Sequence, residues 1–195
     1  MSDPLFGQDD TATPVSPEER ADLIPAYVTT RAELNEAEQA NIIKAALWAH
    51  GRRRDVLDDL FLIRLHKRML GEVWRWAGAY RRSERNIGVA AIRIPMDIRG
   101  LLDDARYWID HKTYPVDEIA ARFHHRLVLI HAFANGNGRH ARLATDLLLT
   151  ALDHAPFTWG RIDLVDPSAT RATYVHALKA ADHHDLGPLL AFVRT

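Results

Sequence analysis

The sequence predicts a mostly α-helical protein with one small β element. Apolar residues recur at helical spacing over most of the chain, and only one short stretch, residues 87–95, is rich in β-branched residues between turn signals. The length of 195 residues fits one ordinary domain, and 47% hydrophobic with 26% charged residues is a globular composition. We therefore expect a single helical domain that carries a small β-hairpin.

The first 25 residues differ in composition from the rest of the chain. They contain four prolines, and six acidic residues against a single arginine. We expect an acidic, proline-containing arm over residues 1–25 and the helical domain over residues 26–195. The arm lacks the basic start and the apolar stretch of a secretory signal, and no apolar run approaches the length that spans a bilayer. A cytoplasmic location without membrane contact is the expectation.

Helix signals divide the domain into seven segments. Thr30 and Glu33 have the spacing of a capping box, and Gly51 and Gly71 stand where two helices should stop. The predicted helices cover residues 30–51, 55–70, 96–111, 116–130, 139–154, 167–181 and 186–193.

Composition also limits the chemistry. The chain has no cysteine, which excludes thiol catalysis, iron–sulfur clusters and disulfide scaffolds. Its 25 basic and 26 acidic residues give a formal charge of −1, so direct nucleic-acid binding is not expected. Residues 75–99 nevertheless hold six arginines against Glu84 and Asp97. This cluster is either a surface for an anionic ligand or a solvated basic face.

Residues 131–142 carry the strongest chemical signal. Gly136, Asn137 and Gly138 are small, flexible residues that let backbone N–H groups converge where a helix begins, which is an anion-binding arrangement. Arg139 and Arg142 follow in the first turn of that helix, where each cation is disfavoured by about 0.3–1 kcal/mol. A bound di- or triphosphate would remove this penalty.

His131 ends the preceding helix and therefore lies across the loop from the predicted anion site. An imidazole titrates near neutrality and can take a proton from an attacking hydroxyl. A single histidine near a helix end is usually only a cap, so the prediction depends on the whole stretch.

This stretch resembles the signature of the Fic (Fic/Doc) family, H-x-F-x-[DE]-G-N-G-R-x-x-R. The matching positions are His131, Phe133, Gly136, Asn137, Gly138, Arg139 and Arg142. Seven positions at roughly 5% usage each would match by chance about once in a billion windows. Residues 29–34, 74–95 and 131–142 most resemble the subfamily called mobile mystery protein B, whose members are typically encoded beside a helix-turn-helix protein.

The resemblance implies a Fic-like helical domain that transfers AMP from ATP to a Ser, Thr or Tyr hydroxyl of a target protein, with Mg²⁺ as cofactor. His131 would be the general base, and Gly138 favours AMP transfer because the Doc branch, which phosphorylates, has lysine there. The phosphates would be bound by Gly136, Asn137, Gly138, Arg139 and Arg142. The target segment would be held by strand addition to a flap made of Ile87, Gly88, Val89, Ile92, Ile94 and Pro95. Expected partners are ATP, the target protein and a helix-turn-helix protein.

One position departs from the family pattern. Asn135 stands where the family usually has Asp or Glu as the Mg²⁺ ligand, and its neutral carbonyl is a weaker ligand for a hard cation. The alternative function is therefore a weakly active or inactive nucleotide-binding Fic module, one half of a toxin–antitoxin-like pair.

A second departure concerns regulation. Many relatives carry an inhibitory helix with the motif [ST]-x-x-x-E-[GN]. Residues 29–34 match its first part, with Glu33 at the glutamate position, but lack the final Gly or Asn. Glu33 is thus either an autoinhibitory residue or only the acidic member of the capping box.

Overall fold

The structure is a computed structural model that describes residues 17–51, 54–160 and 167–195. The first 16 residues of the predicted arm lie outside these ranges. The end of the arm forms a short helix, α1 (Pro17–Asp22). It is followed by Leu23, which is buried with 8% of its surface exposed and pairs with Trp74 in an isolated β-bridge. The last residues of the predicted arm therefore pack onto the domain.

The prediction of a mostly helical fold is confirmed, as are all seven predicted helices. They are α2 (Arg31–His50), α3 (Asp59–Leu70), α4 (Ile94–Asp110), α5 (Val116–Ile130), α6 (Asn137–Ala151), α7 (Pro167–Asp182) and α8 (Gly187–Val193). Thr30 caps α2 with both hydrogen bonds of a capping box, as its spacing with Glu33 predicts. None of the described helices has the length and apolar character that a bilayer crossing requires.

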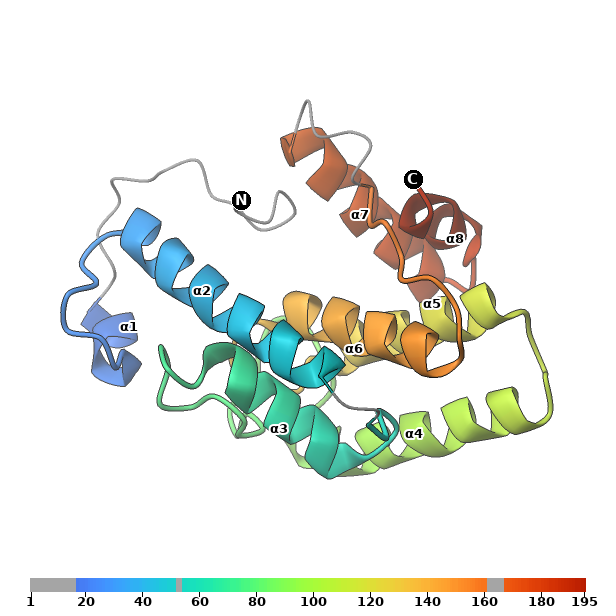
Figure 1. Cartoon of the computed structure of the whole chain (residues 1–195), viewed down its shortest axis with the longest axis horizontal. Helices are drawn as coiled ribbons and strands as arrows, with labels where there is room; N and C mark the ends of the chain where they lie inside the picture. The colour runs from blue at the N-terminus through green and yellow to red at the C-terminus, as the bar shows by residue number, and fades with distance from the viewer. Residues whose placement is uncertain (1–16, 52–53, 161–166) are drawn as a thin grey trace.

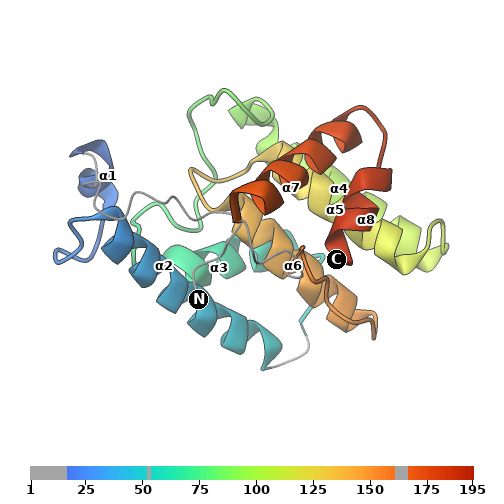
Figure 2. The same ribbon diagram turned by 90° about the horizontal axis from the view of Figure 1, so that it is seen from above.

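The helices pack in neighbouring pairs around α6. Helix α2 lies along α3, α5 packs against α6, α4 packs against α5, and α7 pairs with α8. In both views α6 lies between the α2–α3 pair and the α7–α8 pair (Figure 1, Figure 2). This arrangement brings the N-terminal parts of α2 and α7 to the side on which α6 begins.

Two apolar clusters form the core. The larger one joins α2 to α6 and contains the fully buried Leu65, Ile98 and Phe123. The smaller one joins α5 to the C-terminal helices through Trp159, Tyr174 and other buried side chains.

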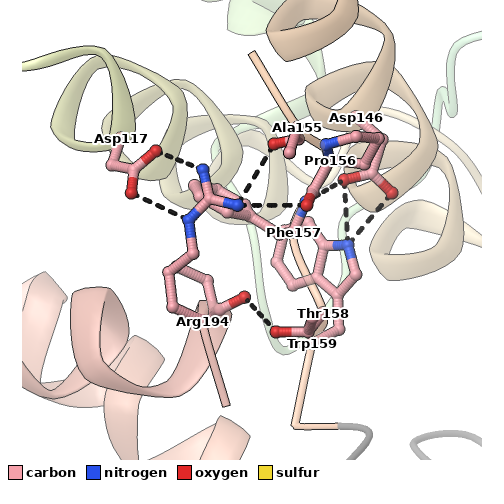
Figure 3. Close-up of polar contacts among 9 residues, drawn as sticks. Asp117, Asp146, Ala155, Pro156, Phe157, Thr158, Trp159 and Arg194 are labelled. Carbon is pink, nitrogen blue, oxygen red and sulfur yellow. Dashed lines mark hydrogen bonds and ion pairs between the residues drawn. The ribbon is translucent and has the colours of Figure 1, made fainter.

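Polar contacts tie the segment after α6 to the C-terminus (Figure 3). Arg194 donates from Nε to Asp117 Oδ2 over 2.8 Å and from Nη1 to two backbone carbonyls of the loop after α6. Asp146 of α6 accepts hydrogen bonds from the Trp159 indole (3.0 Å) and from the backbone N–H of Phe157 (3.1 Å). These contacts fix α8 and the end of α6 relative to α5.

The prediction of a β-hairpin over residues 87–95 is wrong. No β-strand forms within the described residues, and residues 81–90 are an irregular loop. A 3₁₀ turn, η1 (Ala91–Arg93), follows this loop, and Ile94 and Pro95 open α4. Proline suits a helical first turn because its φ is fixed and it needs no N–H partner. The N–H of Ala91 donates instead to the side chain of Glu84 (3.0 Å), so it is not available to a β-ladder.

Candidate active site

The loop between α5 and α6 begins with an uncommon backbone conformation at His131. Its φ of 53° and ψ of 57° are left-handed, a region that residues other than glycine seldom adopt. Arg81, with 5% of its surface exposed, holds the loop in place. Its Nε donates to the His131 carbonyl (2.7 Å), and its backbone N–H donates to the Ala132 carbonyl (2.9 Å). A buried guanidinium thus fixes the orientation of His131.

Arg81 also attaches the preceding loop to His131. Its guanidinium donates to the carbonyls of Ser83 (3.0 Å) and Val89. Gly88, which has a φ of 96°, passes so close that an added Cβ would lie 2.6 Å from the Cβ of His131. Only glycine fits this close approach without displacing the histidine.

The residues predicted to form the flap do not lie together in the structure. Gly88 and Val89 lie beside the α5–α6 loop, and Ile87 and Ile92 are exposed, with 56% and 89% of their surfaces accessible. Ile94 is fully buried in the core, and Pro95 belongs to the first turn of α4.

The interior of the α5–α6 loop is held by Phe133 and Asn137. Phe133 is buried, and its ring stacks on the imidazole of His66 with 3.7 Å between ring centroids. The Asn137 amide closes the loop because it accepts from the Phe133 N–H (2.9 Å) and donates to the Phe133 carbonyl (2.8 Å). Asn137 therefore shapes the predicted phosphate cradle through its side chain, and only its backbone is left to face a ligand.

His66 is a supporting residue that the sequence did not single out. Its Nδ1 accepts a hydrogen bond from the Gly78 N–H (3.0 Å), which places the ring proton on Nε2 and lets Nε2 donate to the Asn135 carbonyl (3.0 Å). Burial lowers the pKa of His66 to about 3, so the ring stays neutral and keeps this tautomer. A lone histidine on an amphipathic helix gives no sequence signal of such a contact.

The N-terminus of α6 is open to a ligand. Gly136 precedes the helix with a φ of 76°, and a Cβ there would lie 2.5 Å from Leu70 Cδ1. No side chain of the described residues caps α6. Its first-turn N–H groups therefore keep the ability to bind an anion.

A hollow of about 270 Å³ lies over this helix start. It brings together the predicted residues His131, Asn135, Gly136, Asn137, Gly138 and Arg139. The lining also includes residues that sequence reasoning missed: Arg31, Leu34, Asn35 and Glu38 of α2, and Arg171 of α7. These side chains come from helices far apart in the sequence, so only the packing of α2 and α7 beside α6 reveals them.

Arg139 is paired with Glu38. Their Nη1 and Oε2 atoms are 2.6 Å apart, and the two side chains are only 15% and 5% exposed. The other carboxylate oxygen of Glu38 accepts a hydrogen bond from the Trp74 indole (2.6 Å). Glu38 is thus a fixed negative charge at the edge of the predicted phosphate site.

Glu33, the predicted inhibitory candidate, has a different environment. Its carboxylate accepts hydrogen bonds from the backbone N–H groups of Thr29 (2.7 Å) and Thr30 (3.0 Å). These bonds lower the pKa of Glu33, the Thr29 backbone bond having the largest effect. The α2 carboxylate that contacts Arg139, in the first turn of α6, is instead Glu38.

Arg142 lies one turn beyond Arg139 and is buried, with 9% of its surface exposed. It is not among the described residues that line the hollow. Its charge acts on the neighbouring His124: burial first, and then Arg142, lower the pKa of that histidine to about 3. Arg142, which the family resemblance makes a phosphate ligand, therefore lies beneath the surface in this structure.

The environment of the His131 side chain favours its neutral form, which can accept a proton. Burial is the main cause that lowers its pKa below the ordinary value, followed by the positive charges of Arg81 and Arg85. The imidazole is therefore neutral at pH 7, and it lines the hollow opposite the helix start.

The donor set does not fit a resident Mg²⁺ ion. Asn135 is exposed, and its side-chain oxygen already accepts the N–H of Gly136 (2.7 Å). The carboxylate in the lining is Glu38, which is bound to Arg139 and Trp74. Among residues 17–51, 54–160 and 167–195, no group of three His, Asp or Glu residues could hold a metal. Mg²⁺ prefers charged oxygen ligands, which the hollow does not offer in free form.

Comparison with known proteins identifies the same family that residues 131–142 resemble. Residues 56–149 match the Fic/DOC family. A protein adenylyltransferase Fic of Drosophila virilis is 32% identical over 137 residues, which are 68% of this chain but only 27% of that protein. The chain thus spans little more than a quarter of the length of the curated relatives that it matches.

Solved structures share the fold. Fic-1 (residues 134–508) from C. elegans has a TM-score of 0.68 and 24% identity, over 91% of this chain and 52% of the other. BepC from Bartonella tribocorum, described with bound AMPPNP, has a TM-score of 0.67 and 17% identity, over 92% of this chain and 97% of the other. With its left-handed histidine, its glycine-bounded helix start and these matches, the chain contains a domain of the Fic/DOC family.

Proposed function

We propose that the protein is an adenylyltransferase that moves AMP from ATP to a Ser, Thr or Tyr hydroxyl of a target protein. The observation that carries this proposal is the position of the neutral His131 imidazole, which lines the same hollow as the open N-terminus of α6. The name of the Drosophila relatives, protein adenylyltransferase, supports the same reaction.

In the proposed reaction, His131 takes the proton of the target hydroxyl while the hydroxyl oxygen attacks the α-phosphorus of ATP. A new bond joins that oxygen to the α-phosphorus, and the bond from the α-phosphorus to the bridging oxygen of the leaving pyrophosphate breaks. The first-turn N–H groups of Gly138 and Arg139, together with the Arg139 guanidinium, stabilise the phosphate charge. No step requires a metal held by this chain.

The target would bind along residues 81–90, next to His131. Gly88 contacts His131 from this loop, and the exposed side chains of Ile87 and Ile92 flank it. Exposed apolar residues beside a proposed catalytic base are suited to hold a target segment. The resemblance to mobile mystery protein B adds a helix-turn-helix protein as a proposed partner.

The second candidate is a nucleotide-binding module with weak or no transfer activity, one half of a toxin–antitoxin-like pair. Two observations favour it. Asn135 replaces the usual acidic ligand, and Glu38 occupies Arg139, which a phosphate would otherwise bind.

Incubation of the full chain with ATP labelled at the α-phosphate tests the proposal. Transfer of AMP leaves the label covalently bound to protein, whereas ATP labelled at the γ-phosphate leaves none. The label should disappear in His131→Ala but persist in His125→Ala, a control on α5, the helix that ends before His131. The His125 imidazole binds Asp182 instead. ATP binding without retained label would favour the module and overturn the transferase.

A further inference from the structure

The loop of residues 81–90 carries two exposed arginines beside His131. Both ends of this loop are attached to the histidine. Arg81 donates to the His131 carbonyl over 2.7 Å, and an added Cβ at Gly88 would lie 2.6 Å from the His131 Cβ. Residues 82–87, between these two attachments, are all exposed. The loop therefore presents the side chains of Arg82 and Arg85 to solvent next to the proposed base.

The charge of these two arginines is not balanced by the loop itself. Glu84, its acidic residue, is already engaged, because one carboxylate oxygen accepts the Ala91 N–H (3.0 Å) and the other lies 3.9 Å from the buried Arg81 guanidinium. Neither Arg82 nor Arg85 makes an ion pair with another residue that the structure describes. Two positive charges beside His131 therefore remain for an anionic ligand.

The position of Arg85 limits where the anionic group would lie. Arg85 precedes Gly88 by three residues, which span at most about 11 Å. Its charge also contributes to the lowered pKa of His131, as expected for a guanidinium near the imidazole. Because an extended peptide advances about 3.3 Å per residue, a carboxylate within roughly three residues of a hydroxyl held at His131 could reach this arginine.

The apolar neighbours of the arginines favour a peptide over a free phosphate. Ile87 and Ile92 expose 56% and 89% of their surfaces beside the same loop. A peptide has apolar side chains that can cover them, whereas a phosphate ion has none.

We propose that Arg82 and Arg85 select target segments that carry Asp or Glu within about three residues of the modified hydroxyl. The inference rests on the proposed function, because it names the class of target that the same site would take. Charge complementarity of this kind contributes mainly to specificity and to the rate of association.

Fluorescence anisotropy of two labelled peptides with the full chain tests the inference without any activity measurement. Both peptides carry a central threonine. Glutamates stand two and three positions to each side of it in one peptide, and lysines stand there in the other. The wild type should bind the glutamate peptide at least about fivefold more tightly, and added salt should reduce the difference because it screens exposed charges.

Arg82→Glu combined with Arg85→Glu should reverse the preference in favour of the lysine peptide. Arg64→Glu combined with Arg68→Glu is the matched control. It makes the same change in total charge at two exposed positions of α3, which line a separate hollow beside Trp48. This control should keep the wild-type preference.

The inference is overturned if the wild type binds neither peptide or binds both alike, or if the two double variants behave alike. It is also overturned if the loop variant loses ATP affinity and keeps the wild-type peptide preference, since the arginines would then bind the nucleotide. Label retained from α-labelled ATP, and lost in His131→Ala, would then show that the proposed transferase still stands. Preference for the glutamate peptide without any retained label would contradict the transferase alone.

Discussion

His131 combines a seldom-used backbone conformation with a side chain surrounded by positive charge. The buried Arg81 fixes the backbone through the His131 carbonyl, and the same residue contributes to the lowered pKa of the imidazole. Arg85 acts on the imidazole only through its charge and is exposed. Arg81 is therefore needed both for the His131 backbone conformation and for the lowered pKa of the imidazole. Removal of Arg85 changes only the charge near the imidazole.

Arg85→Ala should move the acid limb of the pH–rate profile to higher pH. The Arg85 charge disfavours the imidazolium form, so its removal raises the pKa of His131 toward the ordinary value. Less of the histidine is then in the basic form near pH 6, so the rate at pH 6 should fall relative to the variant's own rate at pH 8. AMP transfer measured from pH 5 to 8 checks this. Arg82→Ala is the control, and superimposable profiles for the two variants would refute the role of Arg85.

At the level of single elements, α2 connects the start of the domain to the proposed phosphate site. Its capping glutamate, Glu33, acts within the helix end, whereas Glu38, more than one turn later, reaches across to Arg139. Glu33 therefore has a local role as a helix cap, whereas Glu38 has a role at the proposed site.

Glu38→Gln should bind ATP more tightly than the wild type. Glutamine can still accept the Trp74 hydrogen bond, but it no longer neutralises Arg139, which becomes available to phosphate. Glu33→Gln should leave ATP affinity unchanged and reduce only the free energy of unfolding, because it weakens the α2 cap. Titration calorimetry and urea unfolding of both variants separate these effects. Tighter ATP binding by Glu33→Gln, with no change in Glu38→Gln, would assign the inhibitory role to Glu33 instead.

Across the whole molecule, buried histidines join helices that are distant in sequence. His66 of α3 binds the Asn135 carbonyl, His124 of α5 binds Tyr174 of α7, and His140 of α6 binds the Leu62 carbonyl of α3. Burial is the main cause that lowers their pKa values, to about 3, 3 and 4 respectively. Folding therefore requires these three imidazoles to be neutral.

This requirement predicts a fold that loses stability in mild acid. The unfolded chain takes up protons at these histidines near their ordinary pKa of about 6.5, whereas the folded chain does not until about pH 4 or below. Their contribution is complete above pH 6.5 and is lost as the pH falls from there toward the folded values. Each histidine should lower the free energy of unfolding by roughly 1 kcal/mol between pH 6.5 and 5.5.

Urea unfolding at pH 7.5, 6.5 and 5.5 measures the effect. Carboxyl groups contribute little in this range because their ordinary pKa values are near 4. A free energy of unfolding that is independent of pH between 6.5 and 5.5 would contradict the neutral state of these histidines.

The helices and the α5–α6 loop could be predicted because their signals are local. Helical periodicity, the Thr30 cap and the run from His131 to Arg142 each lie within a few turns of chain. The conformation of residues 87–95 could not be predicted, because the side chains of Arg81 and Glu84 take the backbone groups that a hairpin would use.

The residues around the proposed phosphate site were harder to predict for a different reason. Glu38 and Arg171 are ordinary charged residues of two helices in the sequence, and only the folded structure brings them to the hollow over the start of α6. Glu38 contacts Arg139 across about a hundred positions of the chain, and Arg171 lies more than thirty positions beyond the loop.

A crystal structure of the full chain with an ATP analogue whose α,β-bridging oxygen is replaced by a methylene group, which blocks AMP transfer, is the decisive test of the proposed nucleotide site. We expect phosphate density at the backbone N–H groups of Gly138 and Arg139, with the His131 imidazole facing the α-phosphate. A nucleotide bound elsewhere, with Glu38 and Arg139 still paired across a hollow without phosphate, would contradict it.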